Sequence, residues 1–505
     1  MNELKENKKY LLTAGILSIY IVLAELFDFI SYEHTLMAIF SIFLLFLLSL
    51  VSKTAFSIVG IFVLVVNSAI FHILFHWGKE IVLFERIQVA LLSPPTEIKE
   101  YLQNNISSID IVEFIYLFLG LFGFFYLLKQ KNRLKILRFG AIVLLGLILF
   151  GLYQKSVLNK MIPFRYVEHY VMANSWKDQM IQRKEYIKQN FHKKVLKSYL
   201  YDKVVVIVGE SANKHHMSLY GYRYKTTKFL DSLSHTKSTI KLNVIAPANQ
   251  TRFSVPLCLT DTKVEDFSKY FKTKSIVTKF REVGYKTYWI SNQFKVGEYD
   301  TYISSMANEA NYQKIENLHY VLQQAKVQPD EVLLKEIDKV YKPKQKQLFV
   351  VHLMGSHAMY DKRYPKDKAL FKDPKNVIQE YDNTIFYTDY VLKQLYKRFK
   401  KDRVLFVYFS DHSEIPSTKL GHGFAPSYKN EYEIPLFIYS SVDNKKLAIL
   451  KQKNQKLINN ESLASMVEYL AGLSKDLKLS YDTKVISVSP HRIVDYQKLK
   501  YYKKP

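Results

Sequence analysis

The stretch Val204-Val205-Val206-Ile207-Val208-Gly209-Glu210-Ser211 joins an apolar run directly to a carboxylate and a hydroxyl. A second apolar run, from Val404 to Phe409, ends in Ser410-Asp411-His412. Short runs of β-branched and aromatic residues are typical of strands buried on both faces of a parallel sheet. Because the carboxyl ends of parallel strands meet at one edge of an open sheet, we expect Glu210, Asp411 and His412 to lie close together there. Two carboxylates and an imidazole on rigid elements favour a zinc site.

The rest of the second half of the chain alternates between strand and helix patterns, which predicts a mostly parallel sheet covered by helices on both faces. We place this α/β domain at residues 201–505 and expect its Lys/Tyr-rich end, from Lys498 to Pro505, to be frayed. The expected strands are residues 203–208, 285–291, 347–353, 403–409 and 434–440. The expected helices are residues 226–235, 251–260, 266–283, 328–340, 375–398 and 460–471.

The first half contains apolar stretches about as long as a helix needs to cross a hydrocarbon core of about 30 Å. They lie at residues 11–30, 36–52, 54–75, 111–128 and 136–153. We therefore predict a five-span transmembrane domain over residues 1–153, with an outer surface loop at 76–110. A basic and aromatic connector with an amphipathic pattern, residues 154–200, is expected to join it to the α/β domain.

Positive charge sets the expected orientation, since Lys and Arg accumulate in cytoplasmic loops. The basic clusters before the first span, between the second and third, and between the fourth and fifth all fall on one side when the N-terminus is cytoplasmic. Residues after 153 then lie outside the cytoplasm, which disfavours nucleic acid as a partner despite the net charge of +26. Anionic lipid and polysaccharide are expected partners instead. The single cysteine, Cys258, excludes an intramolecular disulfide.

Histidines follow other predicted strands as well. His352 and His357 lie at and after the strand 347–353, and Gly421-His422-Gly423 begins nine residues after His412. A lone histidine is more often structural than a ligand, and His352, as a strand residue, is a candidate for the core. The placement of several such side chains on successive strand exits nevertheless favours a metal site.

Three hydroxyl groups are candidate nucleophiles. Ser211 lies in a segment that imitates the nucleophile elbow G-x-S-x-G, but Asn213 stands where the second glycine belongs, which weakens a serine-hydrolase interpretation. Thr251 and Ser254 lie in a loop predicted to open a helix, where N–H groups and the helix dipole suit an attacking oxyanion or a covalent phosphate. The alternative that Thr251 only caps the helix stays open on the residues alone.

Six motifs in a fixed order resemble those of the phosphoethanolamine transferase family, which are membrane-anchored relatives of alkaline phosphatases and sulfatases. The five predicted spans and the outer loop fit the same family, so the resemblance covers the whole chain. The motifs are Gly209-Glu210-Ser211 with Met217 to Tyr222, Thr251 with Ser254-Val255-Pro256, His352 to His357 with Arg363-Tyr364-Pro365, Tyr381-Asp382-Asn383-Thr384, Ser410 to Glu414, and Gly421-His422-Gly423.

The resemblance implies a zinc ion held by Glu210, Asp411, His412 and the oxygen of Thr251, with Thr251 as the nucleophile. It also implies that His357 and His422 hold the phosphoryl group or a second zinc ion. The chain departs from the family in two respects. Ala358 stands where a glycine commonly follows the motif histidine, which puts the local turn in doubt, and the disulfides common in many members are missing.

The activity that the resemblance implies is transfer of phosphoethanolamine from phosphatidylethanolamine to an envelope glycolipid, such as lipid A or the lipopolysaccharide core. The transfer would proceed through a phospho-threonine intermediate and release diacylglycerol, in a periplasmic domain anchored in a bacterial inner membrane. One alternative is a phosphoglycerol transferase resembling lipoteichoic acid synthase. The other is a non-catalytic membrane-anchored protein that binds polysaccharide or protein partners.

Overall fold

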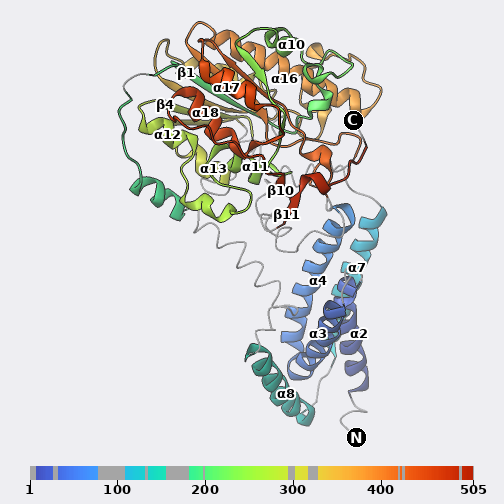
Figure 1. The fold of residues 1–505 in the computed structure, drawn as a ribbon. Helices are drawn as coiled ribbons and strands as arrows, with labels where there is room; N and C mark the ends of the chain where they lie inside the picture. Colours follow the sequence, from blue (N-terminus) through green and yellow to red (C-terminus); the bar gives the residue numbers. More distant parts are fainter. Residues whose placement is uncertain are drawn as a thin grey trace. The chain divides into compact units, whose positions relative to one another are not determined.

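The computed structural model describes residues 7–26, 32–77, 108–130, 135–154, 181–196, 199–293, 302–316, 328–418, 421–423, 427–487 and 492–503 (Figure 1). The chain divides into two compact units. One consists of Met1–Ser93 with Glu97–Ser175, and the other of Pro94–Thr96 with Trp176–Pro505. Most of the predicted outer loop, 78–107, and most of the predicted connector, 155–180, lie outside the described residues. Of the connector, residues 181–189 form a helix.

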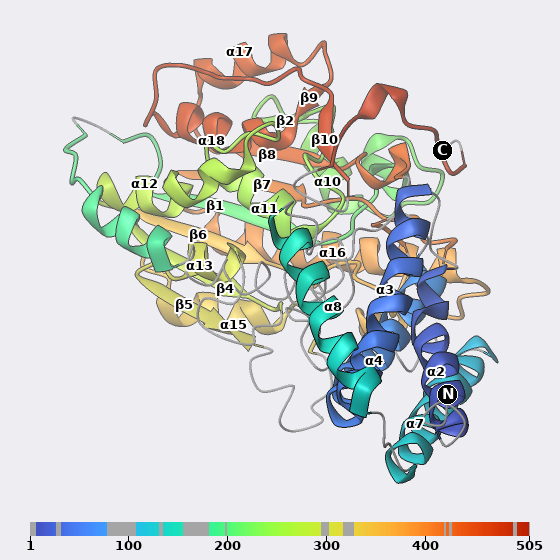
Figure 2. The same ribbon diagram turned by 90° about the horizontal axis from the view of Figure 1, so that it is seen from below.

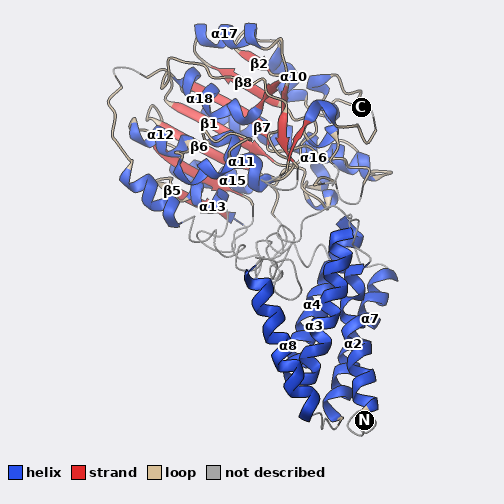
Figure 3. Cartoon of the chain, turned by 60° about the horizontal axis from the view of Figure 1, so that its bottom comes forward, coloured by secondary structure: helices blue, strands red, loops and turns tan. Residues whose placement is uncertain are grey.

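The first unit is helical throughout its described part (Figure 3). Small residues let the helices approach closely, since a Cβ at Gly60 would lie 2.2 Å from the Phe124 ring and one at Gly120 would lie 2.4 Å from Leu64. The helices are α2 (Lys8–Leu26), α3 (Tyr32–Val51), α4 (Lys53–Trp77), α7 (Ser108–Lys129) and α8 (Lys135–Gln154), close to the five predicted apolar stretches.

Across the described parts of the chain, none of the helices reaches the combination of length and apolar character needed for crossing a bilayer. The five membrane crossings stay a prediction.

The second unit is built around a seven-stranded sheet with the order β2-β8-β7-β1-β6-β4-β5. The strands from β7 to β5 run parallel, while β8 and β2 run antiparallel to their neighbours, so the predicted mostly parallel sheet is confirmed. The bounds are β1 (Lys203–Gly209), β2 (Thr239–Lys241), β4 (Lys286–Ser291), β5 (Tyr312–Ile315), β6 (Gln347–His352), β7 (Val404–Ser410) and β8 (Leu436–Ser440).

Helices cover this sheet because both of its faces are apolar. In β1, Val205 and Ile207 point to one face and Val204 and Val206 to the other, and all four are fully buried. The first face packs against α10 (Lys228–Ser234), α15 (Val332–Val340) and α16 (Val377–Phe399). Helices on the other side of the sheet include α11 (Thr251–Leu259), α12 (Ile276–Glu282) and α18 (Leu463–Ala471) (Figures 1 and 2).

Short and irregular elements differ from the sequence prediction. The predicted helix 266–283 is interrupted. A 3-10 helix, Phe267–Lys272, is followed by a short segment with extended backbone, and α12 begins after that segment. Elements of two to nine residues escaped prediction because their patterns are too short, namely β2, β5, β3 (Val244–Ile245), β9 (Ile458–Asn459), β10 (Lys484–Ile486), β11 (Ile493–Asp495), α13 (Tyr302–Ala307) and α17 (Lys445–Lys453).

The expectation of a frayed C-terminus is wrong for residues 498–503. The amide of Lys429 donates to the carbonyl of Lys500 at 2.9 Å, and the side chain of Asn430 bonds to the backbone of Tyr502 and Lys503. Aromatic side chains also pack here, with the centres of the Tyr428 and Tyr502 rings 5.3 Å apart. The end of the described chain is therefore fastened to the segment 428–431.

Candidate active site

Two neighbouring parallel strands deliver the predicted carboxylates to one edge of the sheet. Gly209, the last residue of β1, is in register with Ser410, the last residue of β7. Glu210 and Asp411 therefore leave the sheet side by side, as expected from the two apolar runs. Both are buried, at 1% and 0% exposure.

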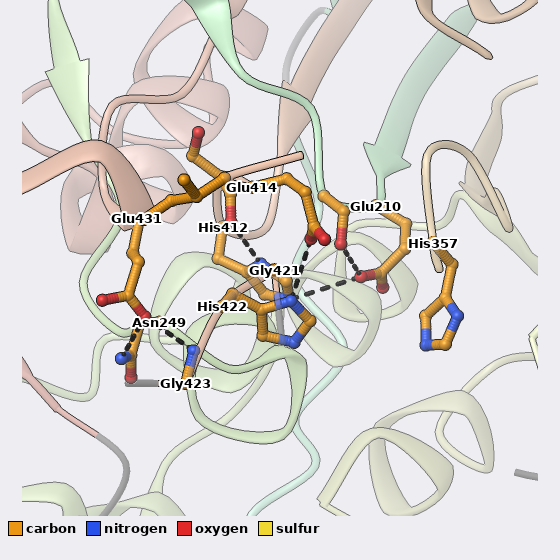
Figure 4. Close-up of polar contacts among 12 residues, drawn as sticks. Glu210, Asn249, His357, His412, Glu414, Gly421, His422, Gly423 and Glu431 are labelled. Atoms are coloured by element: carbon orange, nitrogen blue, oxygen red, sulfur yellow. Dashed lines mark hydrogen bonds and ion pairs between the residues drawn. The ribbon is translucent and has the colours of Figure 1, made fainter. Parts of the chain in front are cut away.

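Four of the predicted site residues converge within hydrogen-bonding or ion-pair distance. The hydroxyl of Thr251 lies 3.1 Å from Oε2 of Glu210 and 3.2 Å from Nε2 of His412. The same His412 nitrogen lies 3.3 Å from Oε1 of Glu210 and 3.4 Å from Oδ2 of Asp411. Figure 4 shows Glu210 and His412 in this cluster.

The donor set fits a zinc ion. Bonds of about 2.0–2.1 Å in tetrahedral geometry separate the ligand atoms by about 3.3 Å, which is close to the distances just given. Oδ2 of Asp411 is buried and makes no hydrogen bond within the described part of the chain, so it has an acceptor position to offer. Glu210, Asp411 and His412 also form one of the groups of side chains whose ligand atoms could hold a metal ion.

The three buried groups shift one another's pKa values. Burial lowers the pKa of His412, but the charges of Asp411 and Glu210 outweigh it and raise this pKa to about 10. Burial and the charge of Glu210 raise the pKa of Asp411. Burial also acts to raise the pKa of Glu210, but the hydrogen bond and charge of His412 hold it below its usual value. In the metal-free protein, protonated His412 thus supplies the positive charge that a bound cation would supply instead.

Thr251 is the first residue of α11, and Gln250 occupies the N-cap position. The alternative that Thr251 merely caps the helix is therefore wrong. At this position the positive end of the helix dipole favours negative charge on the threonine oxygen. The side chain is half-buried, so it is partly open to a substrate.

The other two candidate nucleophiles support the cluster. Ser211 is fully buried, and its hydroxyl donates to Oε1 of Glu210 at 2.8 Å. The hydroxyl of Ser254, also fully buried, donates to the backbone carbonyl of Asp411 at 2.5 Å. Neither side chain is exposed to a substrate, and both orient residues of the predicted metal site.

Gln293 contacts the site but escaped the sequence analysis. Its side-chain amide lies 3.2 Å from Oε2 of Glu210 and donates to the carbonyl of Leu353 at 2.7 Å. It follows β4 by two residues, so the rule that strand exits carry site residues could have found it. It was missed because glutamine is not a typical zinc ligand, whereas the side chains noted after the other strands are carboxylates and imidazoles.

His422 lies beside the cluster with a carboxylate partner that the sequence analysis did not assign. Its ring is 4.0 Å from the His412 ring, and its Nδ1 is 2.9 Å from Oε2 of Glu414 (Figure 4). Oε1 of Glu414 accepts a hydrogen bond of 2.7 Å from Tyr360. Gly421 permits this packing, since a Cβ there would lie 1.8 Å from Glu414. His412, Glu414 and His422 form a second group able to hold a metal ion.

The histidines after β6 have different surroundings. His357 is half-buried in the loop after β6, and burial lowers its pKa to about 4, aided by Arg363. The backbone of this loop is tied to Glu210, whose carbonyl accepts the Ser356 amide at 2.9 Å. His352 is 1% exposed and packs edge-on near Trp289, outside both metal-holding groups, so it belongs to the core as its strand position suggested.

Residues 202–473 match the sulfatase family. Among curated proteins, phosphoethanolamine transferase EptC of Escherichia coli O18:K1:H7 (strain RS218 / NMEC) is 29% identical over 316 residues, which cover 57% of this chain and 53% of that protein. The chain spans about half the length of the curated relatives it matches. The resemblance that the motifs predicted is confirmed by these matches.

Solved structures extend the likeness to the fold. The C-terminal periplasmic domain of Escherichia coli EptC, in a complex with Zn, is 26% identical with a TM-score of 0.52, covering 60% of this chain and 95% of that one. Integral membrane protein lipooligosaccharide phosphoethanolamine transferase A (EptA) of Neisseria meningitidis covers 91% of this chain and 95% of its own, with a TM-score of 0.59. At 17% identity, the second likeness shows a shared fold alone.

Proposed function

Because this chain belongs to the sulfatase family, we propose that it is a zinc-dependent phosphoethanolamine transferase whose nucleophile is Thr251. The observation that carries the proposal is the position of the Thr251 hydroxyl, 3.1 Å from Glu210 and 3.2 Å from His412 at the start of α11. The names of the relatives support the transferred group, and the zinc complex of a related domain supports the metal.

Glu210, Asp411, His412 and the Thr251 oxygen would hold one zinc ion. When bound there, zinc makes a threonine alkoxide accessible near neutral pH and attracts the negative charge of the phosphoryl group. Whether a second ion joins the first depends on His422 and Glu414, which form with His412 the second group of possible ligands.

The chain's own groups account for the steps of a double displacement. Thr251 Oγ1 loses its proton and attacks phosphorus in the phosphodiester of phosphatidylethanolamine, so that a new O–P bond forms. The bond from phosphorus to the diacylglycerol oxygen breaks, and that oxygen takes up one proton as diacylglycerol leaves. A hydroxyl or phosphate oxygen of the acceptor then attacks the same phosphorus and releases Thr251. In this proposal His422 and His357 donate hydrogen bonds to phosphoryl oxygens, and Glu414, 2.9 Å from Nδ1 of His422, orients the His422 ring.

The proposed setting is a bacterial inner membrane, with residues 1–153 as the five-span anchor, 154–200 as the connector and 201–505 as the periplasmic catalytic domain. The apolar stretches of the sequence and the fold likeness to an integral membrane protein support it. An anchored domain meets lipid donors at a high effective concentration. The proposed acceptor is an envelope glycolipid such as lipid A or the lipopolysaccharide core.

The test is the mass of the full-length protein after incubation with phosphatidylethanolamine vesicles. Wild type is expected to gain phosphoethanolamine on Thr251, and Thr251→Ser, which keeps a hydroxyl, is expected to gain it more slowly. Thr251→Ala is expected to fold and to bind zinc through its other ligands but never to carry the group. Labelled Thr251→Ala protein would refute the assignment.

The same experiment separates the alternatives. Labelling from phosphatidylglycerol vesicles in place of phosphatidylethanolamine would indicate a phosphoglycerol transferase. A wild-type protein that is never labelled and binds no stoichiometric zinc would indicate a non-catalytic binding protein. Mass spectrometry of envelope glycolipids from cells with and without the gene identifies the acceptor.

A further inference from the structure

Glu431 is a buried carboxylate that none of the proposed steps uses. It is the last residue of the 3-10 segment Lys429–Glu431, and it is fully buried, at 0% exposure. Burying a carboxylate is costly unless hydrogen bonds replace its water, so its partners explain its place.

The carboxylate of Glu431 accepts hydrogen bonds from three separate positions. Its Oε2 accepts from the side-chain amide of Asn249 at 2.9 Å and from the backbone amide of Gly423 at 2.6 Å. Its Oε1 accepts from the backbone amide of Tyr428 at 2.6 Å. Figure 4 shows the first two bonds meeting at the same end of the side chain.

Two of these partners adjoin residues with proposed roles in transfer. Asn249 precedes Thr251 by two residues, and Gly423 directly follows His422. The backbone carbonyl of Glu431 also accepts from the amide of Ser413, which follows His412. Glu431 thus bonds to the segment just before Thr251, to the loop of residues 421–423 that contains His422, and to the residue after His412.

Glu431 is itself held firmly. The preceding residues, Lys429 and Asn430, bond to the backbone of residues 500–503, as described above. Bonds to residues outside the site therefore fix the position of the Glu431 carboxylate. The loops that bond to this carboxylate are held in place in turn.

Of the two side chains of this shape, glutamate and glutamine, only glutamate can accept hydrogen bonds from all three N–H groups. An ionised carboxylate only accepts hydrogen bonds, and here N–H groups face both of its oxygens. A glutamine of the same shape would turn an NH2 group toward at least one of these donors, which leaves that donor unsatisfied. The substitution Glu431→Gln therefore breaks at least one of the three bonds with little change in volume.

We propose that Glu431 is a positioning residue. One oxygen of its carboxylate bonds to both Gly423 and Asn249, and these bonds hold the loop of residues 421–423, which contains His422, in a fixed position relative to Thr251. This inference rests on the proposed function in the roles that it gives to Thr251 and His422. The hydrogen bonds of Glu431 described above go to Asn249, Gly423, Tyr428 and Ser413, none of which is a proposed metal ligand or nucleophile.

The test compares Glu431→Gln with Glu433→Gln in the full-length, zinc-loaded protein. Glu433 is the matched control, because it is a buried carboxylate in the same segment that accepts from His215, Tyr496 and Tyr501. Hydrogen exchange is followed at residues 421–423, zinc content is measured, and turnover is measured with phosphatidylethanolamine vesicles and in the His422→Ala background.

We expect Glu431→Gln to speed amide exchange at Gly423 and to lower kcat about 10- to 100-fold at unchanged zinc content. In the His422→Ala background the same change is expected to have less than about a twofold effect, since both changes act through one loop. Glu433→Gln is expected to leave exchange at residues 421–423 and kcat close to wild type.

Three results would overturn the proposal: unchanged exchange at Gly423 in Glu431→Gln, turnover like that of wild type, or losses that multiply fully with those of His422→Ala. Failure of the proposed function is distinguishable. A wild-type protein that is not labelled on Thr251 refutes the transfer reaction, while exchange at residues 421–423 still decides whether Glu431 holds the loop.

Discussion

The hydroxyl of Ser211 donates a hydrogen bond of 2.8 Å to Oε1 of Glu210 from a left-handed backbone, with φ at 56°. For a residue other than glycine this conformation costs about 1–2 kcal/mol. The backbone amide of Ser211 also donates to Oδ1 of Asp411 at 3.2 Å. The strained turn thus aims two groups of one residue at two carboxylates of the proposed metal site.

Two substitutions of Ser211 distinguish the effect of its hydrogen bond to Glu210 from the effect of its left-handed backbone. Both Ser211→Ala and Ser211→Gly lose the hydroxyl, so we expect each to bind zinc about 10- to 100-fold more weakly. Glycine adopts the left-handed conformation freely, so Ser211→Gly should exceed Ser211→Ala in stability by about 1 kcal/mol. Chelator competition and urea unfolding of the zinc-free proteins measure the two effects. Wild-type zinc affinity in both variants would contradict a role for the hydroxyl.

Zinc binding should depend on pH because of His412. In the metal-free protein its pKa is raised to about 10, whereas ligation requires the neutral imidazole, so zinc must displace a proton at neutral pH. The zinc-bound state then holds fewer protons than the free state, and affinity should rise with pH by about tenfold per unit for each proton released. Asp411, whose pKa is also raised, should steepen this dependence on the acid side.

Titration calorimetry in two buffers of different ionisation enthalpy counts the protons released on zinc binding. The expected result is at least one proton near neutral pH, and more in acid. A zinc affinity that stays constant across this range would show that His412 is neutral in the free protein or does not bind the metal.

Gly355 should not tolerate a side chain. Its φ is 50°, and a Cβ there would lie 2.8 Å from the carbonyl oxygen of Glu210. We expect Gly355→Ala to lose about 2–4 kcal/mol of stability, from backbone strain and from the clash, and to bind zinc more weakly because Glu210 moves. Gly221→Ala is the matched control, since φ is 99° and no atom lies within 4 Å of the added Cβ. Equal losses in the two variants, measured by urea unfolding, would rule out the contact with Glu210.

The helix of residues 181–189 is fastened to the rest of the second unit by a buried ion pair. Arg183 lies 2.6 Å from Glu309, with side chains 1% and 5% exposed, and donates to the backbone of Tyr270 and Thr273. We expect Arg183→Ala to cost about 3–5 kcal/mol, because it leaves the Glu309 charge buried without its partner.

Arg403 is the control for this prediction. It also pairs with a carboxylate, Asp202, at 2.8 Å, but its side chain is 48% exposed. Arg403→Ala should cost about 1 kcal/mol or less, since water replaces the lost partner. Denaturant unfolding measures both variants, and a loss in Arg183→Ala no larger than that in Arg403→Ala would show that the buried pair does not anchor the helix.

The two strands that end at the site could be predicted from the sequence, since strands buried on both faces of a parallel sheet appear as continuous apolar runs. Val204 to Val208 and Val404 to Phe409 are apolar without alternation, and each run is followed after one residue by a carboxylate. The antiparallel direction of β8 carried no such signal, because a strand buried on both faces shows the same pattern in either direction. The prediction that helix 266–283 is continuous failed for a related reason: periodicity does not show where a turn tightens into a 3-10 segment.

By itself, the sequence determined the α/β order of elements, the two apolar runs that end at Glu210 and Asp411, and the candidate hydroxyls. Only the tertiary structure decided that Thr251 faces the cluster while Ser211 and Ser254 bond to its residues. It also decided that Gln293, Glu414 and Glu431 hydrogen-bond to Glu210, His422 and Gly423, respectively. The physical reason is that a hydrogen bond acts over about 3 Å. Its partners can be far apart in the chain, as Asn249 and Glu431 are by 182 residues, so no local pattern records the pairing.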